Sequence, residues 1–209
     1  MKRFANRREA GRALAAQLAE HTWHDPLVLG LPRGGVPVAA EVAEVLGAEL
    51  DVVVARKIGA PGHPEYGVGA VAVDSAPIYD AAVLRALGLT EEQLAAGCDR
   101  ERAEAARRTA LYRRDRPPLV VEGRDVVVVD DGLATGVTAR AALHWLERRG
   151  PNRLVLAVPV AARQSVRTFS TPVVAVLLPR HLGAVSRWYD RFEQTSDAEV
   201  LEVLDHRER

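Results

Sequence analysis

Residues 126–140 read VVVVDDGLATGVTAR, and this stretch decides the fold class. Four consecutive β-branched residues suit a strand that is buried on both faces, as in a parallel sheet. The two carboxylates that end it repel each other, so stability alone does not explain them. We therefore expect a buried parallel strand with a ligand site at its carboxyl end.

Apolar segments alternate with helical patterns on both sides of this stretch, which predicts an α/β fold with a central, mainly parallel sheet flanked by helices in three layers. Residues 1–209 are expected to form one domain, with a helical insert at 74–120 and a C-terminal tail or hood at 180–209. The expected strands are 26–31, 50–55, 70–73, 125–129, 154–158 and 173–178, and the expected helices are a first one with Phe4, Leu14 and Leu18 on its apolar side, then 36–46, 90–114 and 137–149.

The composition limits the possible partners. Lysine plus arginine equals aspartate plus glutamate at 28 each, so no net charge draws the chain to nucleic acid or to an anionic membrane. Apolar runs fall far short of the roughly 20 residues that span a bilayer. The single cysteine, Cys98, permits no internal disulfide and suits a reducing compartment. We expect a cytoplasmic protein that binds any anion locally.

The segment from Gly132 to Gly136 has the composition of a phosphate-binding loop. Glycines at both ends let the backbone turn tightly and bring its amides close to a ligand. Free N–H groups at the start of the following helix attract phosphate, and the hydroxyls of Thr135 and Thr138 add donors. Asp130 and Asp131 only accept hydrogen bonds when ionised, which suits two vicinal hydroxyls. Together these features indicate a ribose 5-phosphate site.

Other phosphate-binding motifs fit this stretch less well. A P-loop needs a lysine that is missing here, and the glycine string of a dinucleotide-binding fingerprint does not occur. A phosphoacceptor receiver domain also clusters aspartates, but it does not explain the glycine and threonine residues that follow. A plain helix cap would need one aspartate rather than two.

The stretch VVVVDDGLATG resembles the signature of the type I phosphoribosyltransferases. These enzymes bind 5-phosphoribosyl-1-pyrophosphate with Mg²⁺ and transfer the ribosyl phosphate to a nitrogen base, releasing pyrophosphate. Three segments in the same order, GLPRGGVPVA (30–39), RKIGAPGHPEYGVGAV (56–71) and VVVVDDGLATG (126–136), look like the stand-alone bacterial phosphoribosyltransferases whose acceptor is unknown. The resemblance implies the type I fold. We also expect a homodimer, and the balanced charge argues against a nucleic-acid partner.

The resemblance also implies roles for residues at matching positions. Asp130 and Asp131 would hold the ribose hydroxyls, near a Mg²⁺ ion held mainly by the substrate. Arg33 would lie in the pyrophosphate loop, which often has unusual peptide geometry, and Lys57 would reach pyrophosphate oxygens. Catalytic roles would fall to Asp130, Asp131, Lys57 and Arg33. The other substrate-binding positions are Gly34, Gly35, Arg56, Gly132, Leu133, Ala134, Thr135, Gly136 and Thr138, and Pro61–Gly69 would be the flexible catalytic loop.

One position in the loop bears on the acceptor. Enzymes that act on 6-oxopurines generally carry a carboxylate where this chain has Ala134, which argues against hypoxanthine and guanine. Adenine is a possible acceptor. The aromatic residues Trp188, Tyr189 and Phe192 are expected to pack in the core, although aromatic rings after the last strand could also stack a base.

Two other functions remain open at the level of sequence. The pocket could belong to a nucleotide-sensing regulator that binds nucleic acid, for which the arginine-rich helix 90–114 is the candidate surface. It could also belong to a hydrolase or phosphorylase, in which case no pyrophosphate would be released.

Overall fold

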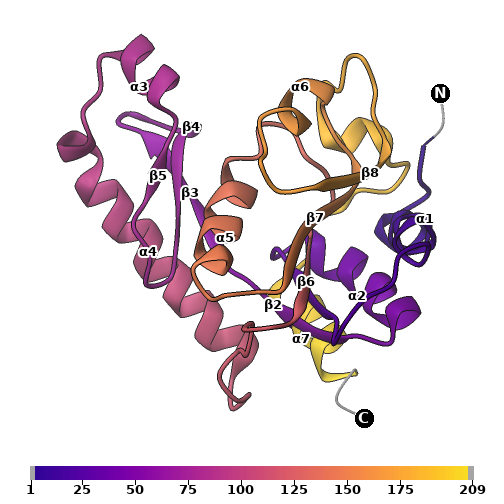
Figure 1. Cartoon of the computed structure of the whole chain (residues 1–209). Helices are drawn as coiled ribbons and strands as arrows, with labels where there is room; N and C mark the ends of the chain where they lie inside the picture. Colours follow the sequence, from indigo (N-terminus) through magenta and orange to yellow (C-terminus); the bar gives the residue numbers. More distant parts are fainter. Residues whose placement is uncertain (1–2, 207–209) are drawn as a thin grey trace.

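The computed structural model describes residues 3–206, apart from the side chains of residues 64 and 65. Its centre is a five-stranded sheet in the order β2, β1, β6, β7, β8, in which every neighbouring pair is parallel (Figure 1). These strands are β1 (Leu27–Gly30), β2 (Glu49–Val52), β6 (Asp125–Val129), β7 (Arg153–Val160) and β8 (Val173–Leu177). The expected α/β fold with a mainly parallel central sheet is confirmed.

Helices cover both faces of this sheet. Helices α1 (Arg7–Leu18), α2 (Gly35–Leu46) and α7 (Asp197–Asp205) pack on one face, and α5 (Val137–Glu147) packs on the other. The valines of β6 are fully buried and alternate between the two faces, since Val127 and Val129 join the first core and Val126 and Val128 join the second. Burial on both sides is the condition under which a continuous apolar strand is stable.

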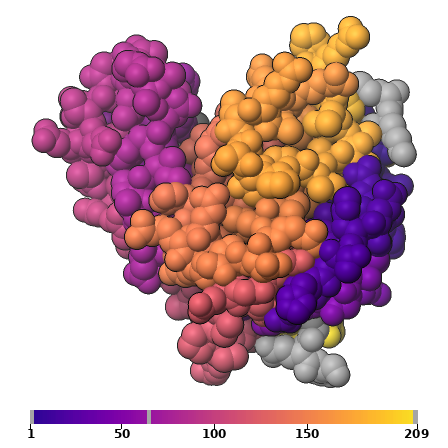
Figure 2. All heavy atoms as spheres, viewed as in Figure 1, coloured from indigo at the N-terminus to yellow at the C-terminus, as the bar shows by residue number. Residues whose placement is uncertain are grey.

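A second sheet forms a separate lobe, which we call the flap lobe (residues 55–113). It contains the antiparallel strands β3 (Ala55–Ala60), β4 (His63–Ala72) and β5 (Ile78–Tyr79), followed by α3 (Ala81–Leu87) and the long helix α4 (Glu91–Arg113). The lobe lies at the left of Figure 1, and Figure 2 shows a notch between it and the body of the molecule. The expected helical insert at 74–120 therefore also carries a strand of this second sheet.

The expected loop at Pro61–Gly69 is wrong as a description of the backbone, because most of it is strand β4. Its glycines allow close approach between strands. A Cβ added to Gly69 would lie 2.6 Å from the Ile78 carbonyl oxygen, and one added to Gly67 would lie 2.7 Å from Cδ of Lys57. A segment with the composition of a loop therefore forms a closely packed β-hairpin. The turn of this hairpin includes Gly62, which has a φ of +75°.

Several element boundaries also differ from expectation. The expected strand 50–55 is two strands in different sheets, β2 and the start of β3. Phe4 precedes α1 and forms a bridge with Tyr189. Helix α4 begins with a capping box formed by Thr90 and Gln93. Four helices were not expected from the sequence: α3, α6 (Arg163–Val166), the 3₁₀ helix η1 (Val185–Trp188) and α7. Within residues 3–206, no helix combines the length and the apolar character needed to cross a membrane.

Candidate active site

Asp130 and Asp131 lie where β6 ends, at the carboxyl edge of the sheet. The Asp130 amide donates to the Ala157 carbonyl of the neighbouring strand at 3.3 Å, and the Asp131 amide donates to Oδ1 of Asp130 at 2.8 Å. Burial raises the pKa of both carboxyls, and the negative charge of Asp131 raises that of Asp130 further. The fold therefore holds two carboxylates in a place that disfavours their charge.

The glycine turn between β1 and α2 packs directly against this pair. A Cβ added to Gly34 would lie 2.0 Å from Oδ2 of Asp131, and one added to Gly35 would lie 2.5 Å from the Val129 carbonyl oxygen. No side chain fits at either position, so both glycines are required by the contact. The peptide bond between Pro32 and Arg33 in this turn is cis. Two segments nearly 100 residues apart in sequence are thus joined at one point.

Two further residues, Arg7 and Tyr189, hold Asp131, and neither was expected to bind it. Nε of Arg7 donates to Oδ2 of Asp131 at 2.9 Å, while the guanidinium lies 3.9 Å from the centre of the Phe192 ring. The Tyr189 hydroxyl donates to the Asp131 carbonyl oxygen at 2.6 Å. Trp188 and Tyr189 are buried, as expected for packing residues. Both ends of the chain therefore contribute to the position of one carboxylate.

The loop after Asp131 presents backbone amides toward the start of α5. The Leu133 amide donates to the Val160 carbonyl at 2.8 Å and its side chain is buried, so this amide is not available to a phosphate as the resemblance implied. Among residues 3–206, the amides of Ala134, Thr135 and Gly136 meet no protein acceptor. Gly136 has a φ of +74° and precedes the first turn of α5, in which Thr138 is half-buried. An anion site is therefore centred on 134–138.

The basic residues to which the resemblance gives a role, Arg33, Arg56 and Lys57, lie in three different environments. A guanidinium nitrogen of Arg33 lies 3.6 Å from an Asp197 carboxylate oxygen on α7. Nε of Arg56 donates to Glu101 of α4 at 2.9 Å. Because neighbouring residues on a strand point to opposite faces, Lys57 points away from α4, on the same face as Ala55, which packs with α5. Of this pair, Lys57 is the residue directed toward the body of the molecule.

The donor set fits a magnesium ion that the substrate would share. In the part of the chain that the structure describes, no group of three or more metal-ligating side chains could hold a metal by itself. Mg²⁺ is commonly bound by one or two carboxylates together with substrate phosphates and water. Asp130 and Asp131 supply carboxylates of that kind beside the anion site.

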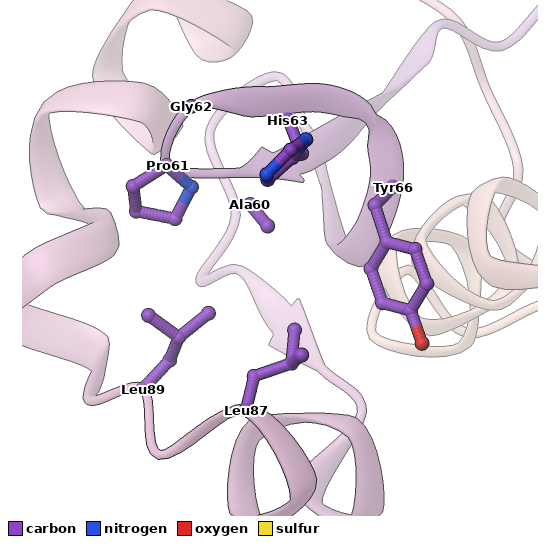
Figure 3. Close-up of a pocket in the computed structure, with 7 residues that line it drawn as sticks. All are labelled: Ala60, Pro61, Gly62, His63, Tyr66, Leu87 and Leu89. Atoms are coloured by element: carbon purple, nitrogen blue, oxygen red, sulfur yellow. The ribbon is translucent and has the colours of Figure 1, made fainter.

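A separate cavity of about 600 Å³ lies within the flap lobe. Figure 3 shows His63 and Tyr66 at the tip of the β3–β4 hairpin facing Leu87 and Leu89 across it. Its lining is largely apolar and includes none of the residues around Asp130 and Asp131, so it is not the site of the acidic pair.

Known proteins resemble this chain over most of its length. The family model described as "Phosphoribosyl transferase domain" matches residues 3–181. The chain is 42% identical over 212 aligned positions to "Putative phosphoribosyl transferase Rv0571c" of Mycobacterium tuberculosis strain H37Rv, and the alignment covers 100% of this chain and 48% of that protein. The chain thus spans about half the length of the curated relatives it matches.

Solved structures agree on the fold. The crystal structure of TT1426 from Thermus thermophilus superposes with a TM-score of 0.82 at 44% identity and covers 97% of each chain. A Neisseria gonorrhoeae protein with bound ppGpp has a TM-score of 0.51 at 13% identity, covers 99% of this chain and 98% of its own, and shares the fold alone. The chain belongs to the phosphoribosyl transferase domain family.

Proposed function

We propose that this protein transfers ribose 5-phosphate from 5-phosphoribosyl-1-pyrophosphate to a nitrogenous base and releases pyrophosphate. The observation that carries the proposal is the packing of the Gly34–Gly35 turn against Asp130 and Asp131, beside the amides that follow them. A ligand bound there would meet two carboxylates, a glycine turn and an anion site at once, which are the groups that a phosphorylated and pyrophosphorylated ribose requires.

Each part of the donor has a matching group in the chain. Asp130 and Asp131 accept hydrogen bonds from the ribose 2- and 3-hydroxyls. The amides of 134–136 and the hydroxyls of Thr135 and Thr138 bind the 5-phosphate. The turn at 33–35 faces the pyrophosphate.

The reaction needs little covalent chemistry from the protein. The bond between C1 and the pyrophosphate oxygen breaks, its electron pair leaves with pyrophosphate, and a lone pair of the acceptor nitrogen forms the new bond to C1. A proton carried by that nitrogen passes to pyrophosphate or to solvent. The protein holds the ring, stabilises the developing charges and excludes water.

Two groups would stabilise the departing pyrophosphate. Lys57 faces the body of the molecule from the flap lobe, so movement of the β3–β4 hairpin would bring its ammonium to the leaving group and cover the site. Mg²⁺, held beside Asp130 and Asp131 by substrate oxygens, would supply charge neutralisation when bound.

Calorimetric titration tests the donor site. Phosphoribosyl pyrophosphate with Mg²⁺ is titrated into the wild-type protein, into the Asp130→Asn/Asp131→Asn double variant and into the control variant Asp115→Asn, which changes an exposed carboxylate. We expect binding to the wild type and the control and loss of most affinity in the double variant. No binding to the wild type would refute the proposal, and the appearance of pyrophosphate with a nucleobase panel would separate transfer from hydrolysis or phosphorolysis.

The charge pairing on α4 favours an enzyme over a nucleic-acid-binding regulator. Arg102 pairs with Asp99 at 2.7 Å, and Arg107 and Arg108 both pair with Glu104 at 2.7 Å. These pairs neutralise much of the arginine-rich face that would meet a phosphate backbone. The regulator would gain support only if nucleic acid shifted the protein on a native gel at about 0.15 M salt.

A further inference from the structure

A cavity of about 580 Å³ opens beside the proposed 5-phosphate loop. One wall is Ala134 and Thr135 of that loop, and the others come from the end of β7 with α6 and from the segment 180–183. Its volume lies in the range of small-molecule sites.

Hydrogen bonds connect the α6 wall of the cavity to the proposed 5-phosphate loop. The Ser165 hydroxyl of α6 donates to the Ala134 carbonyl, and the Ala162 amide donates to the Leu133 carbonyl at 2.9 Å. Leu133 and Ala161 also form a parallel bridge. These contacts join the α6 wall directly to the proposed donor loop, so a molecule in the cavity would lie next to a bound ribose.

The lining has one sign of charge. Arg163, Arg167 and Arg180 line the cavity with His181, whereas no carboxylate lies among its described lining residues. Nε of Arg163 donates to the Leu178 carbonyl at 2.7 Å, which holds that side chain in place. None of the three arginines forms an ion pair within residues 3–206. A cleft of one charge sign concentrates the opposite charge.

We propose that this cavity is the acceptor subsite and that the acceptor is a nitrogen heterocycle carrying a carboxylate or a phosphate group. Guanidinium groups match both anions in a forked geometry, and arginines that pair with no carboxylate of the described chain can be paired by the ligand. The inference rests on the proposed function because it places the acceptor beside the donor loop. Neutral adenine would leave the positive charge of the arginines without an anionic partner.

Binding of matched probes tests the charge of the ligand. The probes are two matched pairs, uracil with uracil-6-carboxylate and pyridine-3-carboxamide with pyridine-3-carboxylate, each titrated into the full chain with and without saturating ribose 5-phosphate. We expect at least one anionic member to bind about tenfold more tightly than its neutral partner and to bind in the presence of ribose 5-phosphate. Equal or weaker binding of every anionic member would overturn the proposal, even if phosphoribosyl pyrophosphate binds normally.

Variants assign the affinity to the cavity. Arg167→Gln and Arg180→Gln should each weaken binding of the preferred anionic probe about fivefold or more and leave the Kd of phosphoribosyl pyrophosphate within about twofold of wild type. Arg12→Gln, on an exposed position of α1, is the matched control. If ribose 5-phosphate displaces the anionic probes, or if the two variants weaken the donor instead, the arginines serve the donor 5-phosphate and the inference fails while the proposed function stands.

Discussion

The carboxyl of Asp130 has a cost to stability that can be measured. Its pKa is raised by burial and by the charge of Asp131, so the folded state holds its proton more strongly than the unfolded chain does. The penalty is therefore absent below the unfolded pKa of about 4, grows as the pH rises toward the folded pKa, and is then constant. Asp130→Asn should raise the melting temperature at pH 8 by about 2 °C or more.

The control for this prediction is Asp115→Asn, which should leave the melting temperature unchanged across the pH range. The advantage of Asp130→Asn should shrink toward zero as the pH falls below about 4. An equal advantage at every pH would mean that repacking, rather than charge, stabilises the variant. An advantage that grows in acid would mean that folding lowers the pKa of Asp130 instead of raising it.

Arg7 is predicted to position Asp131 for the ribose. Arg7→Gln removes the 2.9 Å contact to the carboxylate and the stacking on Phe192, so we expect the affinity for Mg²⁺ and phosphoribosyl pyrophosphate to fall about tenfold, or about 1.4 kcal/mol. Arg7 lowers the pKa of Asp131, so its loss should also move the acidic limb of binding to higher pH. Calorimetry at several pH values measures both effects, with Arg12→Gln as control. An unchanged pH profile would give Arg7 a purely structural role.

Site residues that stand in a local sequence motif can be identified from the sequence, whereas a site residue outside any motif cannot. Asp130 and Asp131 stand out because adjacent carboxylates after a buried strand have no structural reason to exist. Gly34 and Gly35 can be identified because they stand together in the segment GLPRGGVPVA (30–39). Arg7 has no such local signal, because its partner lies 124 residues away and only the folded chain brings them together.

Among elements, the β3–β4 hairpin depends on glycine in a way that a pair of substitutions can test. Gly69→Ala places a methyl group 2.6 Å from the backbone of β5 and should lower the free energy of unfolding by about 1–3 kcal/mol. Gly97→Ala, on α4, meets nothing closer than 3.7 Å and should raise it by up to about 1 kcal/mol, because alanine favours helix. Denaturant titration measures both, and equal effects of the two changes would contradict the role assigned to Gly69.

Sequence patterns predict the elements of the main sheet better than those of the flap lobe. The strand β6 was expected at 125–129 and occupies those residues, because an apolar run buried on both faces leaves no alternative. The hairpin was expected as a loop because glycine and proline usually break strands. Only the folded chain shows that Gly69 lies against β5 and Gly67 against Lys57. Helix α7 was missed although Ser196 and Glu199 form a capping box, a signal that the sequence does contain.

In the whole molecule, α7 links the glycine turn to the flap lobe. Asp197 at its start lies 3.6 Å from Arg33 and accepts a hydrogen bond from the Tyr112 hydroxyl of α4 at 2.6 Å. Farther along the helix, Leu204 is fully buried, and its carbonyl accepts from Arg116 at 2.9 Å. One short helix thus contacts both α2 and α4, so the lobe and the sheet should unfold together.

Leu204→Ala tests this coupling. The substitution empties a fully buried position and should lower the free energy of unfolding by about 2–5 kcal/mol, whereas Glu202→Ala on the exposed side of the same helix should change it by less than about 0.5 kcal/mol. Calorimetry should show a single transition that moves as a whole in the Leu204 variant. If two transitions separate and only one moves, α7 stabilises just one part, and closure of the flap lobe over the site would be independent of the C-terminal helix.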